Sequence, residues 1–309
     1  QLAQFLSEGL CGANERLAKC NRPKDELERK PSMANTSLIR LKTLAGSVAL
    51  AVALASPAAL AEGTKDKVSG SAGVSYNSHF TSYGADVWRA GNELLGNEST
   101  MFMWSDVTFD LEPFSLNFGV WSDINNNVDS AIGGSIQEVD VWAGVGVDVG
   151  QFNLGFTFQQ WYYAGDTEGI IDLKIAFDDS NLLPIALNPS LTWHFRVEGN
   201  GTQEKSSAIV FGISPSFMLI QHDTFPVTLS IPTGIALFVD KDFQGGNKSG
   251  LGYFYIGGSL GIPLGFISSS YGEWSVNFDL TYYNTSPRAI PGNVTDDFVT
   301  GSIGLAVGF

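Results

Sequence analysis

The last residues of the chain alternate between bulky apolar side chains and small or polar ones. From Val299 to Phe309 every second residue is Val, Gly, Ile, Leu, Val or Phe, and the residues between are Thr, Ser, Gly, Ala and Gly. A period of two is that of a β-strand, whose successive side chains point to opposite faces. The pattern indicates a strand with lipid on one side and a lumen on the other.

The same alternation recurs throughout residues 62–309, in segments separated by turn-rich joints. It predicts twelve strands, at 68–80, 99–111, 114–122, 136–148, 152–162, 168–177, 189–198, 206–219, 226–239, 250–262, 273–284 and 297–309. The bulky face of these strands is almost free of charge, whereas the outward face of a water-soluble sandwich would be polar. We therefore expect an all-β fold, a transmembrane antiparallel up-and-down β-barrel of about 12 strands, with 10 or 14 as alternatives. Closure requires 297–309 to pair with 68–80.

Joint length gives the barrel an orientation. Short joints at 112–113 and 149–151 fall at even positions along the chain, and most longer joints fall at odd ones. Outer-membrane barrels have short periplasmic turns and longer extracellular loops, so the odd joints are predicted to be extracellular. Two features fit less well. The even joints 178–188 and 263–272 are long, and Pro215 and Pro232, which cannot donate to a ladder, lie inside predicted strands.

The segment before the barrel has the features of a secretory signal peptide. Residues 33–61 combine the basic residues Arg40 and Lys42, an apolar run at 43–55 and a final Ala59-Leu60-Ala61, which predicts cleavage after Ala61. The apolar run is too short for a transmembrane helix, which needs about 20 residues. Residues 1–32 precede the first Met and carry no core-forming pattern. We expect a non-native or upstream extension, disordered if present, with a genuine cytoplasmic extension as the alternative.

Together these features predict a bacterial, Gram-negative outer membrane as the location. The lipid bilayer and its lipopolysaccharide would then be partners of the outer face. A terminal Phe309 on an amphipathic strand resembles the end signal that the barrel insertion machinery reads, which makes that machinery a further expected partner.

Charge and cysteine content narrow the function. Eight of the 17 Lys and Arg residues and five of the 32 Asp and Glu residues precede Glu62, leaving 9 basic and 27 acidic residues and a net charge of −18. So acidic a protein is a poor partner for nucleic acid. Both cysteines, Cys11 and Cys20, lie in the predicted extension, so neither disulfides nor thiolate metal sites are expected in the barrel.

Strand parity identifies candidates for the lining of the pore. Once the bulky face is assigned to lipid, the opposite face is rich in carboxylates with a few bases. The pore-lining candidates are Trp104, Asp106, Asp110, Glu138, Asp140, Trp142, Asp172, Lys174, His194, Arg196, Glu198 and Asp279. Two interpretations stay open. The charges form ion-paired networks that fill a narrow barrel, or they line a water-filled passage that favours cations. The tryptophans line a solute track or belong to an aromatic girdle.

Enzymatic function is not expected. The barrel segment holds only His79, His194 and His222, without the spacing of a hydrolase motif, and it contains no metal, phosphate-loop or dinucleotide signature. Ser78 and His79 are adjacent, and adjacent residues of a strand point to opposite faces, so we predict that they do not form a catalytic dyad. No catalytic residue, cofactor or metal site is assigned.

Several segments within residues 68–166 resemble the TorF-type porin family of outer-membrane proteins. They are Tyr76–Gly84 after the first strand, Phe118–Asn125 with its Gly-x-Trp-Ser-Asp motif, Glu138–Gly144, and the loop Trp161–Asp166. The Phe-Arg-Gly of the family's first loop is replaced by Thr81-Ser82-Tyr83. The resemblance implies a barrel and a channel, and it does not identify a substrate.

The sequence thus predicts a monomeric or weakly oligomeric outer-membrane channel for passive diffusion of small hydrophilic solutes, with a modest cation preference. The alternative is a plugged or filled barrel with a structural, adhesive or receptor role through its extracellular loops.

Overall fold

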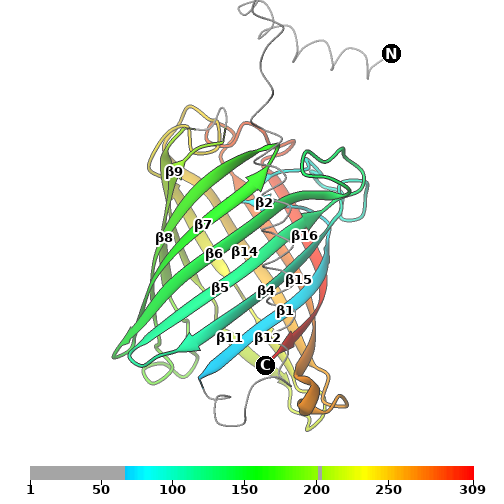
Figure 1. Cartoon of the computed structure of the whole chain (residues 1–309), viewed down its shortest axis with the longest axis vertical. Coiled ribbons are helices and arrows are strands. Elements are labelled where there is room, and N and C mark those ends of the chain that lie inside the picture. The colour runs from blue at the N-terminus through cyan, green and yellow to red at the C-terminus, as the bar shows by residue number, and fades with distance from the viewer. Residues whose placement is uncertain (1–66, 201–203) are drawn as a thin grey trace, which may run out of the picture. The chain divides into compact units, whose positions relative to one another are not determined.

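The structure is a computed structural model that describes residues 67–200 and 204–309 (Figure 1). The predicted extension at 1–32 and the predicted signal peptide at 33–61 lie outside these described residues.

Within the described residues the chain forms one antiparallel barrel with twelve strand positions. They are β1 (Val68–Asn77), β4 (Thr100–Asp110), β5 (Phe114–Ile124), β6 (Ile136–Val149), β7 (Phe152–Tyr163), β8 (Asp166–Phe177), β9 (Ser190–Glu198), β10 with β11 (Ser206–Ile213 and Ser216–Ile220), β12 with β13 (Val227–Ser230 and Thr233–Phe238), β14 (Gly250–Pro263), β15 (Glu273–Thr285) and β16 (Asp297–Gly308). A small hairpin of β2 (Thr81–Ser82) and β3 (Ala85–Asp86) and a 3-10 turn, η4 (Ser269–Tyr271), lie in the connections. The predicted fold and strand number are confirmed.

The barrel closes where the sequence predicts, between its first and last strands. β1 pairs with β16 in a register that places Ala72 opposite Val307 and Val74 opposite Leu305. Gly70 and Phe309 exchange two backbone hydrogen bonds, of 2.9 and 3.0 Å, at the end of this seam. Because lipid offers no hydrogen-bond partners, this pairing removes an edge that would otherwise expose unsatisfied backbone groups.

Proline interrupts two of the predicted strands. The predicted strand 206–219 is divided at Ser214-Pro215 into β10 and β11, and the predicted strand 226–239 is divided at Ile231-Pro232 into β12 and β13. Each proline still contributes its carbonyl, since Pro215 O accepts from Ile231 N (2.9 Å) and Pro232 O accepts from Gly257 N (2.7 Å). The missing N–H groups break the ladder locally without opening the barrel.

The outer surface is apolar. On β7, Leu154, Phe156 and Phe158 point outward and remain 37–42% exposed, as side chains in contact with lipid should be. Such a closed barrel, with apolar residues outside and polar residues inside, is a transmembrane barrel of the bacterial outer membrane. Of the described residues, none lies in a helix long and apolar enough to span a membrane.

Connections alternate in length along the barrel. β1 begins and β16 ends at the same end of the barrel, where the short joints after β4 and β6 also lie (Figure 1). We call this the periplasmic end and the opposite one, which holds the long connection 78–99, the extracellular end. The joint after β7 is an exception, because Ala164 (φ 50°) and Gly165 (φ 78°) make a two-residue hairpin turn at the extracellular end.

Two of the predicted pore-lining residues lie flat against glycines of the neighbouring strand. A Cβ atom placed on Gly73 would lie 2.2 Å from the ring of Trp104, and one on Gly119 would lie 2.1 Å from the ring of Trp142. The tryptophans are the register partners of these glycines, so each ring covers the strand beside it. Their first role is therefore to pack the inner wall.

Replacement of Gly119 by Ala is expected to destabilise the barrel by about 1–3 kcal/mol, because the added methyl group must displace the Trp142 ring. The measurement is urea unfolding of the folded protein in detergent, followed by tryptophan fluorescence. The matched control is Gly292→Ala in an extracellular connection, where a Cβ would meet no atom within 4 Å. Equal stability of the two variants would contradict the assigned packing.

Candidate functional site: the lumen and its extracellular mouth

The connection after β1 folds into the barrel and crosses it. We call residues 78–99 the strap. Its Tyr83 hydroxyl is hydrogen-bonded to His194 Nδ1 on β9, and the two rings lie 4.1 Å apart between centroids. Around the barrel, β9 is the sixth strand from β1 in either direction. The strap therefore spans the lumen and reaches the opposite wall.

Side chains of two other extracellular connections hold the tip of the strap. Gln244 Nε2 donates to the carbonyl of Ser82 (2.9 Å), and Asn293 Nδ2 donates to the carbonyl of Gly84 (2.9 Å). Gly84 has a φ of +79°, and a Cβ there would lie 2.6 Å from the ring of Tyr253. A glycine is required at this position for both reasons.

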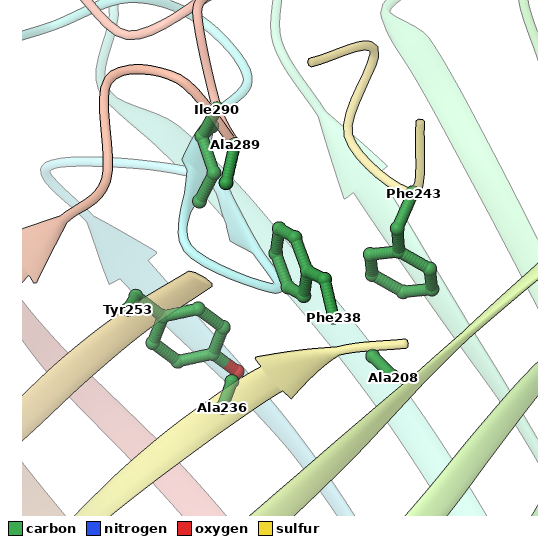
Figure 2. Close-up of a cluster of buried hydrophobic side chains, with 7 residues drawn as sticks. All are labelled: Ala208, Ala236, Phe238, Phe243, Tyr253, Ala289 and Ile290. Atoms are coloured by element: carbon green, nitrogen blue, oxygen red, sulfur yellow. The ribbon is translucent and has the colours of Figure 1, made fainter. Parts of the chain in front are cut away.

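On one side of the strap, beside β10, β13 and β14, side chains fill part of the lumen. We call this region the filled lobe. A cluster of buried side chains occupies it, as Figure 2 shows. Its members are Ala208, Ala236, Phe238, Phe243, Tyr253, Ala289 and Ile290. Tyr83 packs against this cluster, and burial raises the pKa of its hydroxyl well above the ordinary value, with the negative charge of Asp172 adding to the effect. Tyr83 thus keeps its proton.

Three predicted pore-lining residues belong to a paired network next to this lobe. Asp172 Oδ1 lies 2.6 Å from His194 Nδ1. Arg196 is held by Glu168 at 2.5 Å and also donates to the carbonyl of Phe243 (3.0 Å), with its guanidinium 5.0 Å from the Phe243 ring. In this part of the lumen the charged side chains fill the barrel, which corresponds to the first of the two interpretations of the sequence. Removing either partner of such a buried ion pair would leave an uncompensated charge and destabilise the protein.

Two other predicted residues have no basic partner. Glu138 and Asp140 lie two residues apart on β6, so their side chains point to the same face of the strand. The ion pairs within the described residues involve other carboxylates, and Asp140 Oδ1 is buried without a hydrogen-bond partner there. A cavity of about 310 Å³ opens beside Glu138. These two acids occupy the side of the mouth away from the filled lobe.

The remaining candidates are dispersed. Asp106 accepts a hydrogen bond from Ser71 Oγ, and Asp279 accepts one from Ser302 Oγ (2.7 Å), each from an adjacent strand. Asp110, Lys174 and Glu198 are exposed and lie apart from the acids on β6. Of the predicted set, the structure brings Asp172 and His194 into contact, places Arg196 beside Glu168, and puts Glu138 and Asp140 on one face of β6, while the others are dispersed.

One prediction about side-chain contacts is wrong. Ser78 and His79 are not on a strand, since β1 ends at Asn77, and Ser78 Oγ lies 2.7 Å from His79 Nδ1. His79 Nε2 bonds the carbonyl of Gly91 (3.0 Å), and Ser78 Oγ accepts from Gly301 N (2.8 Å). Both side chains are buried, and these bonds tie the start of the strap to β16.

Sequence reasoning also missed one residue that shapes the mouth. The predicted strand 114–122 stops short of Asp123, yet Asp123 lies within β5, one residue before its end, is fully buried and accepts a hydrogen bond from Trp88 Nε1 of the strap (2.9 Å). The signal was present, because Asp123 continues the alternation of Gly119 and Trp121. No group of three or more His, Cys, Asp or Glu in the described ranges is arranged to hold a metal ion.

Comparisons with known proteins give distant likenesses. No family model matches the chain, and no curated protein matches it. Among solved structures, the NanC porin gives a TM-score of 0.43 at 8% identity, covering 78% of this chain and 98% of that one. The KdgM porin gives 0.41 at 9% identity (77% and 99%), and the translocator domain of the autotransporter NalP from Neisseria meningitidis gives 0.41 at 11% identity (89% and 97%). Likenesses this distant add nothing on activity to what the residues of this chain provide.

The attachment of the strap to the opposite wall through Tyr83 can be tested by replacing Tyr83 with Ala. The variant loses both the bond to His194 and its packing on the filled lobe, so the strap should open more often and its backbone at the exposed Arg89, its one Lys or Arg residue, should enter the active site of trypsin more readily. Faster cleavage at Arg89, measured by mass spectrometry of the folded protein, is the expected result. Tyr271→Ala at the periplasmic end, where Tyr271 is already exposed, should cleave like the unmodified protein. Equal rates of cleavage at Arg89 in the two variants would show that Tyr83 does not hold the strap in place.

Proposed function

We propose that the protein is a channel of porin type, through which small hydrophilic solutes diffuse with a modest preference for cations. The observation that carries the proposal is the pair Glu138 and Asp140, whose carboxyl groups lack a basic partner and face the part of the mouth that the aromatic cluster does not occupy. Carboxylates in such a position raise the local concentration of cations and disfavour anions.

The inner wall below the mouth supports a passage. At many inward positions toward the periplasmic end the side chain is small or absent, which leaves space inside a barrel of this width. These positions include Ser71, Gly155, Gly261, Gly304 and Ala306. The solute would enter beside the strap and continue along a wall of small residues.

We also propose how the protein reaches the outer membrane and to which proteins it is related. Residues 33–61 would direct secretion, and the strand that ends in Phe309 would be read by the barrel insertion machinery. Lipopolysaccharide would contact the outer face. The motif resemblance within residues 68–166 suggests the TorF-type porins as relatives.

The alternative, a filled barrel with a receptor or adhesive role, is favoured by the strap and the filled lobe. Planar-bilayer recordings of the purified protein separate the two. Ion-selective single-channel currents are expected for the channel, whereas silence in a folded, heat-modifiable protein would support the filled barrel.

The acidic side of the mouth gives a second test. Combined replacement Glu138→Gln and Asp140→Asn should move the reversal potential in a KCl gradient toward zero, because it removes the two unpaired carboxylates. Asp110→Asn, at the periplasmic end of β4, is the matched control and should change the potential less. An unchanged potential in the double variant would refute the acidic-mouth mechanism.

A further inference from the structure

The cavity beside Glu138 is enclosed by four parts of the extracellular mouth. The strap, the β5–β6 connection, the start of β6 and the β7–β8 turn contribute its lining, which consists of Val87, Trp88, Asp129, Ala131, Gln137, Glu138, Tyr163 and Ala164. Its volume of about 310 Å³ lies at the lower end of the range of roughly 300–1,000 Å³ that is usual for small-molecule sites.

The two aromatic rings of the cavity are fixed in place by hydrogen bonds to carboxylates. Trp88 Nε1 donates to Asp123 (2.9 Å), and the Tyr163 hydroxyl donates to Glu168. Both donors are thereby used, so the rings can offer a ligand only their π-faces. A π-face attracts a cation.

The amide of Gln137 is similarly committed. Its Nε2 donates to the carbonyls of Asn125 (2.6 Å) and Val128 (2.9 Å), which uses both amide protons and leaves the side-chain carbonyl as the group free to meet a ligand. The polar side chains of the cavity therefore present acceptors and almost no donors. Such a lining suits a ligand that carries several donors.

Glu138 supplies the charge. It is only 9% exposed and lines the cavity, yet within residues 67–200 and 204–309 it receives no hydrogen bond from an amide, a hydroxyl or a basic group. Its polar neighbour is Asp140, another carboxyl, which itself keeps one buried oxygen without a partner. Arg196 on β9 is committed to Glu168, Ser206 and Phe243, and Arg89 of the strap is exposed. A buried carboxylate without a partner calls for a cation from outside the chain.

We propose that this cavity binds the primary ammonium group of a small solute, with Glu138 as the carboxylate partner and the rings of Trp88 and Tyr163 beside it. A primary ammonium has a positive charge and three donors, which match the acceptors of Glu138 and Gln137. Asp129 at the exposed rim adds negative charge on the approach. The inference deepens the proposed function and rests on it in one respect: the bound amines would be solutes on their way into the channel.

The test is isothermal titration calorimetry of the purified protein in detergent with 4-aminobutan-1-ol and with 1,4-butanediol, which differ only in the ammonium group. Saturable binding is expected for the amine and none for the diol. Glu138→Gln should weaken amine binding tenfold or more, because it keeps the shape of the side chain and removes its charge. Trp88→Leu should weaken it less, since it removes one ring. Asp110→Asn, remote from the cavity, should bind like the unmodified protein.

Three outcomes would overturn the inference: no saturable binding of the amine, equal binding of the diol, or unchanged affinity in a Glu138→Gln variant that migrates as a folded, heat-modifiable barrel. Bilayer recordings separate this failure from that of the channel. Cation-selective currents without amine binding would overturn the ammonium site alone. Amine binding in a silent barrel would keep the site and overturn the channel.

Discussion

The hydrogen bonds between β1 and β16 are the constraint on which the rest of the structure depends. In lipid each unpaired backbone group costs several kcal/mol, so strands of this length are stable only when the ring is complete. Completion fixes an even number of antiparallel strands, with the start of β1 and the end of β16 at the same end of the barrel. It also explains where irregularity is tolerated. Pro215 and Pro232 interrupt two neighbouring strands that stay paired with each other on both sides of the break, β10 with β13 and β11 with β12, although β11 forms no ladder with β9. By contrast, β1 and β16 pair without interruption.

Once the ring is complete, its interior presents a second problem, because a barrel of twelve strands is too wide for its wall side chains alone to fill evenly. The chain fills it unevenly. The strap crosses the diameter, apolar and aromatic groups fill the space beside β10, β13 and β14, and unpaired acids face the space beside β5 to β8. The contacting pairs Asp172 with His194 and Glu168 with Arg196 lie between the two. The mouth is thus electrically asymmetric, and this asymmetry underlies both proposals.

Features that depend on neighbouring residues could be predicted from the sequence. The period-two alternation gave all twelve strands and the inward face of each, because side-chain direction in a strand depends only on parity. The pairing of the first and last strands followed from closure. The alternation does not fix where a strand ends. The predicted strand 114–122 stops before Asp123, although Asp123 continues the alternation and lies in β5.

Features that depend on distant contacts could not be predicted. Parity places Glu138 and Arg196 on the same face, but it cannot indicate that Arg196 is engaged by Glu168 while Glu138 has no base. Tyr83 contacts His194, which lies 111 positions further along the chain, and no local pattern in the sequence of the strap indicates that it turns into the lumen. The contact between Ser78 and His79 escapes prediction for a related reason, since both residues lie beyond the end of β1 at Asn77, where the alternation of a strand no longer holds.

The strap begins directly after β1, which is one of the two strands at the seam, and its far end is bonded to the wall opposite that seam. Any sideways parting of β1 from β16 would therefore draw Tyr83 away from His194. Sealing of the wall against lipid and occupancy of the mouth are mechanically linked, so this barrel cannot release a molecule laterally into the membrane without also rearranging its entrance.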